Sequence, residues 1–196
     1  MNIKQSLGFT LLELMIVVAI IGIIASMAVP SFQSMLERNR LKEAAESLKS
    51  DLMFARTESI KQSRNIIVNR STGDNGAWCY GMDIAKDYDA DGDIDNDDGG
   101  CDCTEADDTE DDYCSLKIVL GNSSPQTNIK SVFDADTTFD FRRGTSANAN
   151  TCFSTTNYTV KVKTSNAGRT VICTNNNSTA LAGIDACPNS DSVCAL

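Results

Sequence analysis

A long apolar run near the N-terminus limits what this chain of 196 residues can fold into. The segment from Phe9 to Val29 is apolar except for Thr10, Glu13 and Ser26, and the only cation before it is Lys4. A helix of this length would reach about 31 Å at ~1.5 Å per residue, close to the thickness of a bilayer's hydrocarbon core. The sequence therefore predicts one membrane-spanning helix.

Glu13 is the unusual member of this run. A carboxylate in an apolar environment costs several kcal/mol unless it is paired or lies near the interface. A cleaved secretory signal ending in the small residues around Ala28 is one alternative interpretation, and a plain single-pass anchor is another. The carboxylate and the length of the run both argue against the cleaved signal.

The junction Gly8-Phe9-Thr10-Leu11-Leu12-Glu13-Leu14 resembles the processing site of type IV prepilins. The resemblance implies that prepilin peptidase cuts after Gly8, that the new N-terminal residue Phe9 is methylated, and that Glu13 and Pro30 serve assembly. Separately, a Glu13 buried among bundled apolar helices has one compensating charge within reach, the N-terminal amine of a neighbouring chain. We therefore predict that Glu13 pairs with the Phe9 amine of an adjacent subunit.

Beyond Pro30 the helical pattern becomes one-sided. Apolar residues recur at alternating steps of four and three, which predicts a single buried face. These residues are Leu41, Ala45, Leu48, Leu52 and Ala55. The opposite face is predicted to carry Lys42, Glu43, Glu46, Lys49 and Asp51. We expect one continuous helix from Phe9 to about Gln62.

From Asn65 onward the period shortens and turn residues multiply, which predicts antiparallel strands. The expected strands are Asn65 to Arg70, Trp78 to Ala85, Ser115 to Leu120, Ile129 to Phe133, Thr137 to Arg142, Tyr158 to Thr164 and Arg169 to Thr174. The last two form the clearest hairpin, joined at Ser165 to Gly168, and the polar stretch Thr145 to Asn150 is expected to be a loop. A helix followed by strands predicts an α+β fold, a long transmembrane and amphipathic helix packed on an antiparallel β-sheet head.

The pattern divides the chain into four segments. We expect a leader at residues 1–8, a transmembrane and filament-core helix at 9–29, its amphipathic continuation at 30–64, and a β-rich, disulfide-containing head at 65–196 with an acidic insertion at 83–112.

Several motifs downstream of Pro30 resemble those of the GspH/FimT family. They are Ala44-Ala45, Ala55 to Ile60, Trp78-Cys79-Tyr80-Gly81 before an Asp/Gly-rich loop, Phe139 to Gly144, and Gly168-Arg169. The resemblance implies a structural subunit and not an enzyme: a minor type IV pilin at or near the tip of a pilus, priming assembly, or a minor pseudopilin of type II secretion. The implied partners are other pilins or pseudopilins, prepilin peptidase and an inner-membrane assembly platform. Before assembly the chain would span the bacterial inner membrane once, with a periplasmic head.

Composition narrows the chemistry further. The chain has no histidine, which removes Ser-His-Asp and Cys-His nucleophile arrangements and His-containing zinc sites.

The net charge is −10, yet fifteen acidic residues lie between Asp83 and Asp112 with a single cation, and the remainder carries a net charge of +4. Some members of the resembled family bind DNA through a Gly-Arg motif with a second arginine. Arg169 is the corresponding candidate contact, but the second arginine is absent, so nucleic acid is not the expected partner.

The acidic insertion contains a pattern typical of calcium loops. Aspartates alternate around a glycine at Gly92 with an aliphatic residue at Ile94, so that alternate side chains converge on one ion. The candidate ligands of Ca²⁺ are Asp87, Asp89, Asp91, Asp93, Asp95 and Asp98, the last standing where an EF-hand has glutamate. A solvated acidic tract without an ion is the alternative. A secreted calcium-binding module cut after Ala28 is the corresponding alternative function.

Eight cysteines follow Trp78, and an even number in an exported chain predicts disulfides. They are Cys79, Cys101, Cys103, Cys114, Cys152, Cys173, Cys187 and Cys194. We expect Cys187 to pair with Cys194 and Cys152 with Cys173. The first four could instead bind zinc, but one residue between Cys101 and Cys103 is shorter than the usual gap.

Overall fold

A computed structural model describes residues 9–85, 100–105, 107–109, 112–123, 130–174, 181–187 and 194. The chain forms two compact units, Met1–Glu37 and Arg38–Leu196. The candidate leader, including Gly8, and the six candidate calcium ligands lie outside the described residues.

Helix α1 (Leu11–Gln62) begins in the first unit. Thr10 caps it, because its hydroxyl accepts a hydrogen bond from the backbone N–H of Glu13 at 3.2 Å. Every residue from Phe9 to Gln33 is exposed. The helix continues through Pro30, although proline supplies no N–H to the helical ladder. The predicted continuous helix from Phe9 to about Gln62 is therefore confirmed, with its start two residues later.

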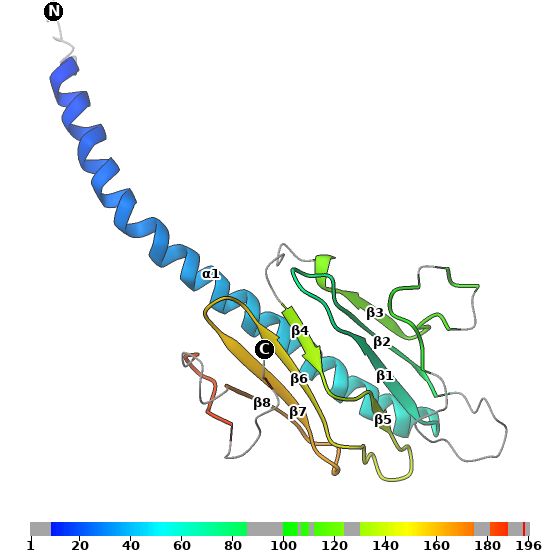
Figure 1. The fold of residues 1–196 in the computed structure, drawn as a ribbon. Helices are drawn as coiled ribbons and strands as arrows, with labels where there is room; N and C mark the ends of the chain where they lie inside the picture. Colours follow the sequence, from blue (N-terminus) through cyan, green and yellow to red (C-terminus); the bar gives the residue numbers. More distant parts are fainter. Residues whose placement is uncertain are drawn as a thin grey trace, which may run out of the picture. The chain divides into compact units, whose positions relative to one another are not determined.

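The second unit contains the rest of α1 and two antiparallel sheets (Figure 1). The first sheet has the strand order β3-β2-β1-β5 and the second β4-β6-β7-β8. The strands are β1 (Ile66–Ser71), β2 (Cys79–Ile84), β3 (Lys117–Leu120), β4 (Lys130–Phe133), β5 (Thr137–Phe139), β6 (Ala149–Ser154), β7 (Thr159–Thr164) and β8 (Thr170–Thr174), with a short 3-10 helix η1 (Gly121–Ser123) after β3. This confirms the predicted α+β class, a long helix packed on antiparallel sheets.

The core lies between the apolar face of α1 and both sheets. The predicted stripe on α1 is buried throughout, from Leu41 to Ala55. It meets Val68 of β1, Phe153 of β6 and Val160 of β7. Trp78 joins the layers, with its ring centroid 5.1 Å from that of Phe153. The two sheets therefore share one core around the helix.

One polar residue departs from the prediction. Asp51 was placed on the exposed face of the helix, but its side chain is buried against the first sheet. Its carboxylate accepts hydrogen bonds from the Tyr80 hydroxyl at 2.8 Å and from Lys117 Nζ at 2.6 Å. Burial raises the pKa of Tyr80 above its usual value of 10.0. Asp51 therefore joins the helix to β2 and β3 through a buried polar contact.

Strand β6 was also missed. Residues 145–150 were expected to be a loop, but Ala149 and Asn150 begin a strand that pairs with both β4 and β7. Its sequence, Ala-Asn-Thr-Cys-Phe-Ser, lacks the β-branched alternation that marks strands in sequence. Its pairing partners on both sides, and not its own composition, make it a central strand.

Candidate functional site

The largest candidate functional surface is the exposed apolar part of α1. Its large side chains are open to solvent, among them Phe9 at 77 %, Leu11 at 78 % and Met27 at 73 % of full exposure. By length and composition the helix is able to cross a membrane. An apolar surface of this size is unstable in water and requires a lipid or protein partner.

Glu13 lies in the first turn of this surface. Its carboxylate takes part in no hydrogen bond or ion pair among the described residues, and the bond from its backbone to Thr10 is local. An acid in the first helical turn is favoured by the partial positive charge of the helix N-terminus. That effect alone does not offset several kcal/mol of desolvation, so burial of this surface leaves Glu13 in need of a cation.

All eight cysteines form disulfides, as predicted, but neither favoured pairing occurs. The bonds join Cys79 to Cys103, Cys101 to Cys114, Cys152 to Cys194, and Cys173 to Cys187. The Cys152–Cys173 prediction was wrong because β7 separates their strands, and both residues align with Lys161 on its two sides. Cys187 and Cys194 bond instead to those two strands. The zinc alternative is excluded, since disulfide sulfurs cannot act as thiolate ligands.

The first two disulfides cover the face of the first sheet that lies away from α1. Their four cysteines form a small buried cluster against Ile118 of β3. The covering segment is so close to β2 that a Cβ atom at Gly81 would overlap Cys114 Sγ. The disulfides thus hold the described second half of the acidic insertion, from Cys101 onward, on this sheet.

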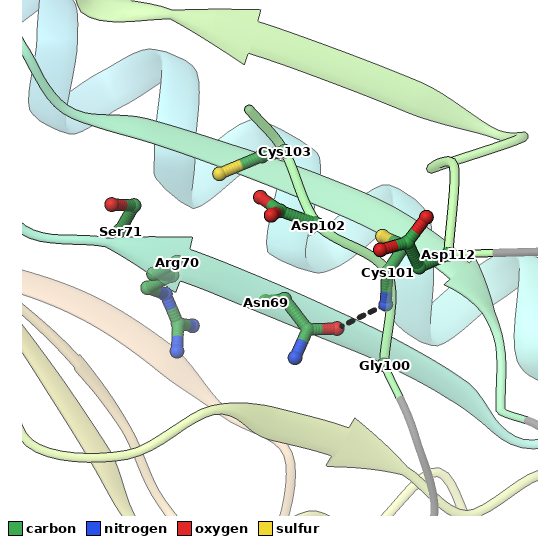
Figure 2. A pocket seen from close by; sticks show the side chains of 8 residues that line it. All are labelled: Asn69, Arg70, Ser71, Gly100, Cys101, Asp102, Cys103 and Asp112. Atoms are coloured by element: carbon green, nitrogen blue, oxygen red, sulfur yellow. Dashed lines mark hydrogen bonds between the residues drawn. The ribbon is translucent and has the colours of Figure 1, made fainter. Parts of the chain in front are cut away.

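A pocket of about 380 Å³ lies where that segment crosses β1 (Figure 2). The Asn69 side-chain oxygen accepts a hydrogen bond from the Cys101 N–H at 3.0 Å. The Arg70 side chain points away from the carboxylates of Asp102 and Asp112. The pocket therefore does not bring its arginine and its acids together.

Arg70 serves the packing of the sheets. Its guanidinium donates to the Ala135 carbonyl and to the Thr137 hydroxyl, both at 2.7 Å. Burial lowers its pKa to about 10, and the nearby carboxylate of Asp136 opposes that shift. Burial also raises the pKa of Asp136, whose carboxylate accepts hydrogen bonds from the backbone of Arg70 and from Asn69. These contacts join the end of β1 to the residues just before β5, next to the pairing of the two strands.

Arg169, the candidate DNA contact, is exposed just before β8. It follows the predicted turn Ser165 to Gly168, in which the Gly168 N–H donates to the Ser165 carbonyl at 2.7 Å. The structure thus confirms the turn and the exposure of Arg169, and the DNA contact stays a prediction.

Two known sequence families match this chain. Residues 44–181 match the family described as "Type II transport protein GspH", and residues 3–29 match the "Prokaryotic N-terminal methylation motif". The chain belongs to the GspH family. Together the two matches make it a type IV pilin-like protein, and the N-terminal junction and the head motifs pointed to this group correctly. Its family consists of structural subunits.

Fimbrial proteins are among the relatives of this chain. A "Fimbrial protein" of Pseudomonas aeruginosa is 39% identical over 71 residues, 36% of this chain and 46% of that protein. A "Fimbrial protein" of Moraxella nonliquefaciens is 50% identical over 80 residues, 41% of this chain and 44% of that protein. The match thus spans less than half the length of these relatives. A crystal structure of the minor pilin FimU of Pseudomonas aeruginosa is similar with a TM-score of 0.45 and 19% identity, over 68% of this chain and 88% of that one.

Proposed function

We propose that this chain is a minor type IV pilin, a structural subunit that enters a pilus or caps its tip and primes assembly. The observation that carries the proposal is the exposed apolar part of α1, where Glu13 has no side-chain partner among the described residues, on a chain of the GspH family that has the N-terminal methylation motif. In the inner membrane the apolar residues face lipid, with the head in the periplasm. In a filament they face the helices of other pilins.

Processing supplies the missing charge. Cleavage after Gly8 by prepilin peptidase creates an amine on Phe9, which N-methylation leaves cationic. An assembly platform then transfers the subunit from lipid into the filament. There the Phe9 amine of one subunit pairs with Glu13 of its neighbour, and the pair offsets the desolvation of both charges.

The deciding experiment is a comparison of the wild-type chain with Glu13→Ala and Glu13→Asp in the native host. We expect Glu13→Ala to be inserted and processed but to be at least about tenfold depleted from sheared pili, because a buried amine without a partner costs several kcal/mol. Glu13→Asp keeps the charge and should be depleted less. Intact mass establishes whether each chain begins with methylated Phe9. Normal incorporation of Glu13→Ala, or native material that retains Met1, contradicts the proposal.

A minor pseudopilin of type II secretion is the second candidate, favoured by the description of the matched family as a type II transport protein. The two functions separate in a deletion strain. A pilin deletion reduces surface pili and leaves protein secretion intact, whereas a pseudopilin deletion has the opposite pattern.

A further inference from the structure

One end of the head collects arginines from three separate segments. They are Arg56 in the last turns of α1 and Arg64 just after its end, Arg142 and Arg143 in the turn after β5, and Arg169 after the β7–β8 turn. We call these five residues the basic end. Figure 1 shows the C-terminal end of α1 and the β7–β8 turn at the same end of the sheets.

Close contacts bring these segments together. The backbone N–H of Phe141, beside Arg142, donates to the Asn65 side chain at 3.2 Å. The β7–β8 turn packs on both neighbours: a Cβ at Gly168 would overlap the carbonyl oxygen of Gly144 and lie 3.0 Å from Arg56 Nε. The arginines therefore form one surface and not three separate ones.

The basic end is not neutralised within the described part of the head. Among the described residues none of its five arginines forms a salt bridge. Arg142 lies instead over the ring of Phe141, 5.3 Å from its centroid. The nearby Asp140 carboxylate accepts backbone hydrogen bonds from Arg142 and Arg143, so it holds the turn. Four of the five arginines are exposed, and Arg56 is half-buried. Exposed arginines without an ion pair favour a negatively charged partner.

The same chain carries a surface of the opposite sign. Asp102, Asp107, Asp108 and Asp112 are exposed on the segment that the Cys101–Cys114 disulfide closes, and we call them the acidic lobe. This lobe covers the outer face of the first sheet, whereas the basic end lies where α1 ends. Two complementary surfaces at different places on one chain allow the basic end of one copy to bind the acidic lobe of another.

We propose that the basic end binds the acidic lobe of a second copy of this chain. The inference deepens the proposed function by naming a partner for the head. Only the place of the contact, between subunits of a pilus, rests on that function. The contact is electrostatic, so it acts when the exposed helix is covered by lipid or detergent and does not depend on the pairing of Glu13.

The test uses the full chain in a nonionic detergent, with self-association measured by sedimentation velocity. We expect association at an ionic strength of about 0.01 M, where the Debye length is ~30 Å, and its loss at about 1 M, where it is ~3 Å. Arg142→Glu with Arg143→Glu should weaken association at least about tenfold, and Asp108→Lys with Asp112→Lys should do the same. The control Arg40→Glu with Lys42→Glu makes the same charge change near the other end of the head's helix and should associate as the wild type does.

Mixing two complementary variants tests which surfaces meet. Arg142→Gln/Arg143→Gln and Asp108→Asn/Asp112→Asn chains should each stay apart alone but form dimers when mixed, since each supplies the surface the other lacks. Near-ultraviolet circular dichroism like that of the wild type establishes that each head is folded. The proposal is overturned if self-association does not change with salt or in these variants, or if the mixed chains do not pair. It is also overturned by a basic end that binds a DNA oligonucleotide while self-association is absent, because its partner is then nucleic acid.

Discussion

The two parts of α1 have the same secondary structure and opposite relationships to the rest of the chain. From Phe9 to Gln33 every side chain is exposed, whereas from Leu41 to Ser59 one face is buried in the head. The buried face of the second part packs against the sheets of the same chain. The first part has to obtain a partner from lipid or from other subunits, which is why its apolar residues surround the helix while those of the second part form a stripe.

The largest effect expected from this comparison is on stability. Leu48 is fully buried, so Leu48→Ala should lower the free energy of unfolding by about 2–5 kcal/mol. Ile20→Ala removes a similar side chain that is 51 % exposed and should leave the head's stability within about 0.5 kcal/mol. Urea unfolding in detergent, followed by fluorescence of the single Trp78, measures both. Equal losses of unfolding free energy in the two variants would show that the two parts of the helix contribute equally to the stability of the head.

Asp51 and Glu13, one acid from each part of the helix, give the next comparison. Asp51→Asn weakens contacts with Tyr80 and Lys117 and should cost about 1–3 kcal/mol of head stability. Glu13→Gln should leave head stability unchanged, since Glu13 has no side-chain partner among the described residues. The same unfolding measurement applies to both. A stable Asp51→Asn chain would mean that the buried contact adds no net stability.

Calcium binding is a test of whether the stability of the head depends on the candidate ligands Asp87 to Asp98, which lie outside the described residues. If Asp87 to Asp98 bind the ion as the sequence predicts, calcium at a hundred times its dissociation constant should stabilise the head by about 2.7 kcal/mol. Thermal unfolding in calcium and in chelator measures this. The matched variant Asp91→Asn with Asp93→Asn should lose the response, and identical melting of the wild type in both buffers counts against the site.

The smallest effect concerns pH. Because burial raises the pKa of Asp136 above its usual 3.8, the native state binds more protons than the unfolded state just above that pH. The contribution of Asp136 to stability is therefore complete below pH 3.8 and is lost as pH rises through the raised value. Asp136→Asn lacks this dependence, so the wild type should lose stability relative to it over that interval. A constant difference from pH 3 to pH 7 would exclude the shift.

The sequence predicted those parts of the fold whose local pattern and tertiary environment agree. The stripe from Leu41 to Ala55 and the β7–β8 hairpin each have the right period, and each is found as expected. Asp51 was misplaced because its charge was taken as evidence of exposure. Its spacing, three after Leu48 and four before Ala55, would have placed it on the buried face.

The remaining features depend on contacts distant in sequence. The disulfide pairing could not be predicted, because it depends on β7 lying between β6 and β8. Strand β6 is polar and is defined by its neighbours. The basic end joins residues 56 to 169, and only the folded chain brings them together.

The disulfides have a mechanical consequence for a filament subunit. All four lie beyond Trp78, so no covalent bridge ties α1 to the sheets. Among the described residues, tension on α1 would be resisted by side-chain packing and by the polar contacts of Asp51 and Ser47 with the first sheet. If these yielded, the chain from Arg38 to Asn65 could extend to about 95 Å before β1 itself was pulled on. Such a head would lengthen under force while its sheets stayed intact.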